Sequence, residues 1–180
     1  PVTTTPFDPD FFNAAATSFT CVSTGVDFDD RLAPVMILYN LISANTWSAD
    51  DQERAQISID TRQGLLKVVG LYIVPMVGMA CGHLEYDADL VRKNSEKMAQ
   101  LTAMIPDLFK IDTSQSGIES DSLATIWENA EDFNEKAIVA SERASTLAKA
   151  ARQGKSEFMK AFGATGAACK SCHDDYRQKQ

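Results

Sequence analysis

Three residues near the end of the chain have the types and spacing needed to hold a porphyrin. Cys169, Cys172 and His173 stand in the pentapeptide Cys-Lys-Ser-Cys-His. In a helix, residues i, i+3 and i+4 share one face, so two thiols and one imidazole can meet the same planar group. Thiols can add across the vinyl groups of haem, and a neutral imidazole can ligate its iron. The motif predicts one covalent haem c, with Cys169 and Cys172 as thioethers and His173 as axial ligand.

Two other kinds of site also use a close cysteine pair. A thioredoxin-like dithiol sits at a helix start after a strand, where amide dipoles lower the thiol pKa. Here the pair lies about four turns into a predicted helix with no strand before it. A closed zinc site needs a fourth ligand, and the only other histidine in the chain is His83. Both alternatives therefore fit the sequence less well than haem.

The elements that must position these residues repeat at helical spacing, which predicts an all-α protein. Apolar or small residues of the last segment are spaced 4, 3, 4, 3 and 4 apart, at Phe158, Phe162, Thr165, Cys169, Cys172 and Tyr176. The preceding segment, from Phe133 to Ala151, has the same spacing. Two such helices joined by a short turn at Gln153-Gly154 are expected to pack antiparallel in a helix bundle.

Two further helices are predicted upstream. One begins after the capping residue Ser48, carries Pro75 late in its length with a kink there, and ends by about Gly82. Another includes Leu90 and Val91 and ends near Pro106, because the residue before a proline avoids helical dihedrals. Between Phe109 and about Leu123 the sequence is polar and rich in turn residues, which predicts a long connecting loop.

We divide the chain into residues 48–180, the helix-bundle domain, and residues 1–47, a partly helical N-terminal extension. The extension has its own apolar row, formed by Leu32, Val35, Met36, Tyr39 and Ile42. Such a row needs an apolar partner surface. The extension is expected either to cover one face of the bundle or to act as a contact arm between subunits.

Charge and hydropathy narrow the class of protein. The 17 basic and 25 acidic residues give a formal charge of −8, which argues against nucleic-acid binding. The stretch 32–42 is shorter than the roughly 20 apolar residues of a membrane span and contains Pro34, so no span is expected. No basic segment followed by an apolar one opens the chain, so we expect any export signal to have been removed.

Three parts of the sequence resemble the cytochrome c′ family. They are residues 161–177 around the Cys-Lys-Ser-Cys-His motif, Thr61-Arg62-Gln63 in the first long helix, and Ile126-Trp127 before the third. The resemblance covers about residues 58–180 and leaves residues 1–57 without a counterpart. Proteins of this family fold as four-helix bundles, which agrees with the helices predicted from spacing.

The resemblance implies an up-down-up-down four-helix bundle, a homodimer, a location in the bacterial periplasm and a five-coordinate haem iron. It also implies an apolar pocket on the open side of the iron that admits nitric oxide or carbon monoxide. Leu66 looks like the distal pocket residue, Arg62 like the group beside a haem propionate, and Arg177 like the arginine beyond the proximal histidine. Alternatively, Leu66 is a core residue and the two arginines are ordinary surface charges.

The sequence leaves the sixth coordination position open to two interpretations. His83 is about 25 Å from Leu66 along a helix and cannot reach the iron. Met104, and Met36 in the extension, are not excluded as ligands by position. An empty position predicts a gas-binding protein, whereas a Met ligand predicts an electron carrier with a redox partner protein. A weak peroxidase or NO-consuming enzyme ranks last, because no distal His/Arg pair is present.

The two isolated cysteines, Cys21 and Cys81, are predicted to form a disulfide, since an exported protein is permitted one. The bridge would tie the extension to the far end of the first helix and add about 4 kcal/mol of stability. The alternative is two buried free thiols.

Overall fold

The computed structural model describes residues 47–179, and its first helix, α1, covers Ala49–Ala80. Ser48 caps α1 as predicted, because its Oγ accepts from the Asp51 amide at 3.2 Å. The Ser48 amide donates in return to the Asp51 carboxylate at 3.3 Å. This reciprocal pair satisfies two amide groups that a helix start otherwise leaves without partners. α1 continues through Pro75, and the chain turns at Gly82, whose φ of 77° suits glycine.

The second helix, α2, covers Ala88–Ala103 and starts at Asp87, whose carboxylate accepts from the Asp89 and Leu90 amides at 3.0 Å. It ends three residues before Pro106, as predicted. A single turn, α3 (Ile105–Leu108), follows and holds the proline in its first turn, where the missing amide hydrogen costs no helical bond. Residues 109–124 then form the predicted long loop.

The last third of the chain contains the two helices predicted from their spacing. After the short α4 (Thr125–Glu128) come α5 (Ala130–Ala150), the 3-10 turn η3 (Ala151–Gln153) and α6 (Lys155–Tyr176). Gly154 joins η3 to α6 with a φ of 106°, which a residue with a side chain rarely adopts. The predicted Gln153-Gly154 turn is confirmed.

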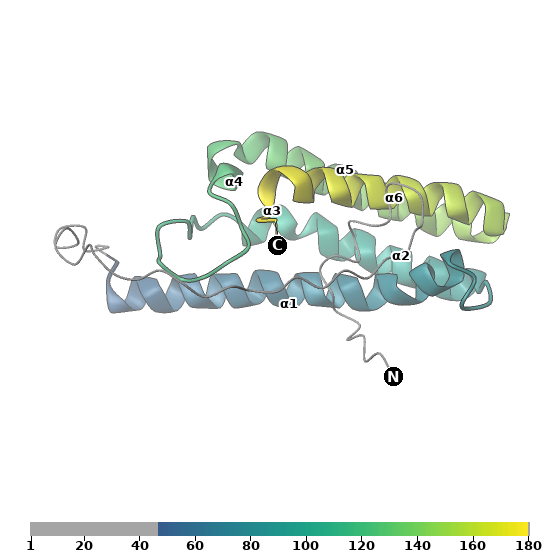
Figure 1. Cartoon of the computed structure of the whole chain (residues 1–180), viewed down its shortest axis with the longest axis horizontal. Helices are drawn as coiled ribbons and strands as arrows, with labels where there is room; N and C mark the ends of the chain where they lie inside the picture. Colours follow the sequence, from purple (N-terminus) through teal and green to yellow (C-terminus); the bar gives the residue numbers. More distant parts are fainter. Residues whose placement is uncertain (1–46, 180) are drawn as a thin grey trace, which may run out of the picture.

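The four long helices form an antiparallel bundle (Figure 1). α2 packs most extensively on α5, and α5 packs on α6, while α1 packs on α2 and α3. Within residues 47–179 the only extended pairing is one isolated bridge between Ser122 and Arg177. The predictions of an all-α fold and of an antiparallel four-helix arrangement are confirmed.

The buried apolar side chains form two separate clusters. The larger one, which we call the turn-end core, lies toward the turn after α1 and joins α1, α2, α5 and α6. Its members are Val69, Ile73, Met76, Met79, Val91, Met98, Ala99, Ala144, Leu147, Ala151 and Phe158. The smaller one, the loop-end core, lies toward the 109–124 loop and consists of Ile126, Phe133 and Tyr176, with Phe109, Trp127, Ile105 and Cys172 packed against it.

α1 is long and apolar for a helix of a bundle. Of the described helices it alone is both long enough and apolar enough to cross a membrane, with a mean hydropathy of 1.5 in its most apolar window. Core helices of soluble proteins can pass the same test. The expectation that the chain has no membrane span was based on residues 32–42 as the longest apolar stretch. α1 contains another apolar stretch, which that expectation did not consider. Its inward face is buried against α2 and the loop, so α1 does not offer its whole circumference to a lipid phase.

Candidate functional site

Cys169, Cys172 and His173 lie in the last two turns of α6 and project from one face, as their spacing predicts. All three side chains are half-buried. Within residues 47–179 no three His, Cys, Asp or Glu side chains surround one point as the ligands of a metal ion would. The three groups therefore suit a broad group that each can reach separately, which a porphyrin is and a zinc ion is not.

The electrostatics of the two thiols also argue against a redox dithiol. Burial raises the pKa of the Cys169 thiol to about 11. Burial, and then the neighbouring Cys169, raises the pKa of Cys172 to about 11 as well. A reactive dithiol needs a lowered thiol pKa, so these two cysteines lack the thiolate character that exchange chemistry requires.

Burial has the opposite effect on the neighbouring imidazole. It lowers the pKa of His173, and Arg177 lowers it further by charge repulsion. A lowered pKa keeps the imidazole neutral near pH 7, and the neutral imidazole is the form that ligates iron. The donor set thus fits covalent haem attachment with one axial histidine.

A polar network holds the last turn of α6 against α5. Lys136 Nζ on α5 donates to Asp132 and to Asp175 at 2.8 Å each. The Tyr176 hydroxyl donates to Asp132, and the Lys136 ammonium lies 5.5 Å from the Tyr176 ring centre. The Leu123 amide adds a bond to the Tyr176 carbonyl at 3.0 Å. These contacts fix the turn that carries Cys172 and His173, and the helical spacing of the sequence did not predict them.

Leu66, the predicted distal residue, lies on the inward row of α1. The row has members three or four residues apart: Ala55, Ile59, Arg62, Leu66, Val69, Ile73 and Met76. All the other members of this row are buried, whereas Leu66 is 41% exposed. An apolar side chain on a core-facing row is normally covered, so this position leaves room for a group that residues 47–179 do not supply.

The facing row of α6 shows a similar break. It is buried at Thr165 and at Tyr176, but Cys169 and Cys172 between them are only half-buried. Leu66 lies near the middle of α1, and Figure 1 shows the carboxyl end of α6 above the middle of α1. The two breaks therefore fall at one level, between the turn-end core and the loop-end core. A flat apolar group bound to the two cysteines would complete the core there.

Arg62, the predicted propionate residue, is almost completely buried and holds the 109–124 loop. Its side chain is 3% exposed. It donates to the Leu108 carbonyl and Thr113 Oγ1 at 2.8 Å, and to the Ile111 carbonyl at 2.6 Å. Its guanidinium lies 4.5 Å from the Phe109 ring centre and 5.4 Å from that of Trp127. It is therefore not an ordinary surface charge. A guanidinium has five N–H donors, so the propionate contact stays a prediction beside this role.

Arg177 directly follows α6 and lies within electrostatic range of His173. Its amide donates to the His173 carbonyl at 3.1 Å, and its guanidinium is 3.4 Å from the Asp121 carboxylate in the loop. The position agrees with a place on the proximal side, and the proximal role itself stays a prediction.

The methionines differ in whether they can approach the iron. Met76, Met79 and Met98 belong to the turn-end core. Met104 caps the carboxyl end of α2 and is 48% exposed, so its position does not exclude it as a ligand. Met36 lies outside the described residues.

The predicted disulfide joins a described residue to one outside that range. Cys81 lies at the carboxyl cap of α1 and has no disulfide partner among residues 47–179. Cys21, like the rest of residues 1–46, lies outside the described residues, so the bridge stays a prediction.

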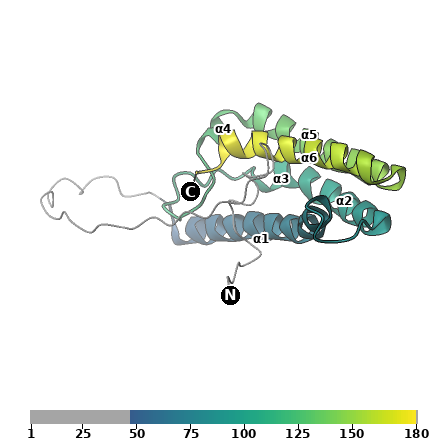
Figure 2. The same cartoon turned by 45° about the vertical axis from the view of Figure 1, so that its right-hand side comes forward.

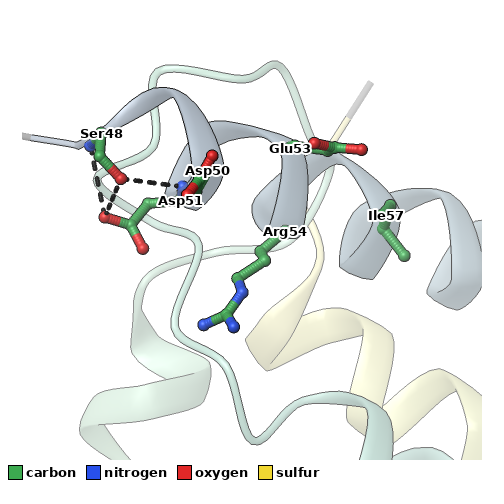
Figure 3. A pocket seen from close by; sticks show the side chains of 6 residues that line it. All are labelled: Ser48, Asp50, Asp51, Glu53, Arg54 and Ile57. Carbon is green, nitrogen blue, oxygen red and sulfur yellow. Dashed lines mark hydrogen bonds between the residues drawn. The ribbon is translucent and has the colours of Figure 1, made fainter.

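A shallow pocket opens at the start of α1 (Figure 3). Its lining is polar apart from Ile57, and it includes both partners of the cap, with Ser48, Asp50, Asp51, Glu53, Arg54 and Ile57 as members. None of these residues carries a thiol or an imidazole, so the pocket lacks the chemistry that the α6 site has.

Fold and site together define a class of protein: an antiparallel four-helix bundle with a haem-attachment motif on its final helix. The family model described as Cytochrome C′ matches residues 58–177. This chain therefore belongs to the cytochrome c′ family, whose members are generally non-enzymatic haem proteins and typically periplasmic.

Individual relatives agree with this assignment. Cytochrome c′ of Cereibacter sphaeroides is 34% identical over 128 residues, which cover 70% of this chain and 86% of the relative. Cytochrome c-554 of the same species is 31% identical over 151 residues, which cover 83% of this chain and 99% of the relative.

Solved structures show the same fold. A cytochrome c′ structure from Rhodobacter has 33% identity and a TM-score of 0.65, covering 70% of this chain and 98% of that one. A nitric oxide complex of a leucine-to-alanine mutant of cytochrome c prime from Alcaligenes xylosoxidans has 28% identity and a TM-score of 0.62. It covers 70% of this chain and 97% of that one.

Proposed function

We propose that this chain holds one haem c through thioethers at Cys169 and Cys172, with His173 as the axial ligand and the opposite side of the iron open to nitric oxide or carbon monoxide. The observation that carries the proposal is the break in both inward rows, at Leu66 on α1 and at the two cysteines on α6. The bound haem supplies an iron that takes up a small neutral gas molecule and changes oxidation state.

The chain's own residues set which gas molecules are accepted. Leu66 offers only hydrocarbon, so it provides no hydrogen bond to a bound ligand and disfavours water at that position. Dioxygen depends on such a hydrogen bond more than NO and CO do, and the pocket should therefore discriminate against it. Burial lowers the pKa of His173 and keeps its imidazole neutral, and the hydrogen bonds of Lys136 hold the last turn of α6 that carries it.

A six-coordinate electron carrier is the second candidate function. Two observations favour it: the similarity to cytochrome c-554, and the place of Met104 at the end of α2, outside the turn-end core. In that case Met104 would fill the sixth position, and a redox partner protein would exchange electrons with the haem. We infer for either function that the protein acts in the periplasm. The homodimer implied by the family resemblance is part of the same proposal.

Spectroscopy of the purified holo-protein separates these possibilities. Acid-acetone extraction should leave the haem on the chain, and loss of the colour to the organic phase would contradict the proposal at its base. The ferrous protein should show a high-spin, five-coordinate spectrum that changes on addition of NO or CO. A low-spin ferrous spectrum with no response to NO would instead assign the electron-carrier function.

The matched variant for the second function is Met104→Ala. It should leave the spectrum of a five-coordinate protein unchanged. If Met104 were the sixth ligand, the same substitution would convert a low-spin spectrum to a high-spin one.

A further inference from the structure

The outward face of α1 presents an uncharged row that no described helix covers along most of its length. Its members are spaced three or four residues apart: Ile57, Thr61, Gly64, Val68, Leu71, Pro75 and Gly78. Ile57 is 58% exposed and Leu71 is 59% exposed, and Val68 and Val74 are exposed as well. Figures 1 and 2 show α1 at the edge of the bundle in both views, with the other long helices on one side only.

This outward row has the composition of a helix-packing surface. It combines large apolar side chains with the small residues Thr61 and Gly64, which let a second backbone approach closely, whereas Gly78 is already covered by the side chain of Leu84. At Gly64 an added Cβ would meet no atom within 4 Å, so the row is open there. A solvated helix face normally carries charged residues, and none occurs in this row.

The sequence just before α1 supplies a segment of matching character. Residues 1–46 precede the start of α1, and their apolar row, Leu32, Val35, Met36, Tyr39 and Ile42, has helical spacing. We propose that residues 32–42 pack as an antiparallel helix on the outward row of α1. The proposal concerns the fold of this chain and does not depend on the haem or its ligand.

The length of the connection fixes the register of this pairing. Six Cα steps separate Ile42 from Ser48, and they span about 20 Å at full extension. Ile42 placed beside residue 58 lies about 15 Å along α1 from Ser48, at 1.5 Å per residue. Allowing for the spacing of 8–10 Å between packed helices, the connection reaches. Residues that face each other then have numbers that add to about 100, so Met36 faces Gly64.

The isolated cysteines agree with the antiparallel direction of this pairing. Residue 32 lies beside residue 68, so the chain that precedes residue 32 and holds Cys21 comes from the end of α1 that carries Cys81. Cys81 itself follows Leu71, Val74 and Gly78 at steps of three, four and three. An antiparallel pairing therefore brings the only two cysteines outside the haem motif toward the same end of α1.

The covalent connection to α1 favours residues 32–42 over a second copy of the chain as the segment that covers the outward row. A segment joined by a short connection has an effective concentration in the millimolar range, far above that of a second molecule in dilute solution. A lipid surface would compete for the same row, but it would also have to accept Asp60 and Lys67, which flank the row on α1.

Disulfide trapping in the full-length holo-protein tests the register. In a background with Cys21→Ser and Cys81→Ser, the pair Met36→Cys and Gly64→Cys is oxidised with glutathione disulfide, which takes up the two electrons and two protons. Peptide mapping then shows whether the link lies within one chain or between two. The matched control pair is Met36→Cys with Lys93→Cys, since Lys93 is an exposed residue of α2.

We expect a link within one chain at a rate at least about tenfold above that of the control pair, as a high effective concentration requires. A link between two chains would overturn the proposal and assign the row to a second copy. A rate equal to that of the control would also overturn it. Should the glycine variant fail to fold, Tyr39→Cys with Thr61→Cys tests the same register at a position that already carries a side chain.

Discussion

Replacing Arg62 by methionine tests the role that the structure gives to the most deeply buried charge in the site. Methionine keeps an unbranched apolar side chain against Phe109 and Trp127 but removes all donors. The Leu108 and Ile111 carbonyls and Thr113 Oγ1 then lose the partner that ties the loop to α1. We expect a lower free energy of unfolding, because buried acceptors left without donors are costly.

The size of the effect follows from the contacts. Three hydrogen bonds from a charged donor contribute at least about 1.5 kcal/mol each, and the stacking on aromatic rings adds about 1 kcal/mol. Removing a buried charge returns part of this, because its burial was unfavourable and lowers the pKa of Arg62. The net loss should be about 3 kcal/mol, which lowers the Tm of a protein of this size by about 6–12 °C.

Urea unfolding of the holo-protein, followed by far-ultraviolet circular dichroism, measures this loss. The control is Arg177→Met, because the Arg177 side chain is 27% exposed and its ion pair with Asp121 spans 3.4 Å. Such an exposed pair is worth less than about 1 kcal/mol. If Arg62→Met cost no more than Arg177→Met, Arg62 would not be the anchor of the loop. A changed Soret band with unchanged stability would then favour the propionate contact instead.

Three further predictions have defined outcomes. Leu66→Ala should raise the rate of CO binding to the ferrous protein on the order of tenfold, because lowering the steric barrier by about 1.4 kcal/mol has that effect. Flash photolysis measures this rate. An unchanged rate would mean that Leu66 does not line the pocket. Cys169→Ala with Cys172→Ala should release the haem into acid-acetone, whereas Cys81→Ala should not. The Tyr176 hydroxyl donates to Asp132, which raises its pKa to about 12. Its share of stability is therefore present below pH 10 and lost as pH rises toward 12. Absorbance at 295 nm should show a phenolate step near pH 12 that Tyr176→Phe removes, and removal of a step near pH 10 would contradict the contact.

The helices were predictable because their signals are local. The spacing of Phe158, Thr165 and Cys172 defines a helix face without any knowledge of its neighbours. Ser48 and Gly154 mark a helix start and a turn by their own chemistry. The end of α1 at Ala80 agrees with the expectation that this helix ends by about Gly82.

The support of the site was not predictable to the same degree, because it depends on residues far apart in the chain. Arg62 finds its partners 46 to 51 residues away, in a loop whose sequence indicates only that it is a loop. Lys136 reaches Asp132 at helical spacing, but its second partner, Asp175, is on another helix. An aromatic residue at either end of a polar loop was the one available sequence signal, and Phe109 and Trp127, both half-buried in the structure, are such residues. The family resemblance singled out Arg62, but it gave no reason for the side chain to be buried.

The separation of the two buried clusters predicts different effects for mutations in the turn-end core and in the loop-end core. The turn-end core joins all four long helices and determines whether the bundle forms. The loop-end core is small, includes Tyr176 and touches Cys172, so it determines where the last turn of α6 sits. A conservative loss in the first, such as Leu147→Ala, should lower stability with the haem spectrum unchanged. An equal loss of volume at Phe133 should lower the stability and also change the haem spectrum. Phe133 contacts Phe109 on the loop side and Tyr176 on the α6 side, with ring centres 4.8 and 5.3 Å away. Cys169, Cys172 and His173 lie beside the loop-end core, on the side toward the turn-end core, and among residues 47–179 the cysteines and Leu66 are left partly exposed there.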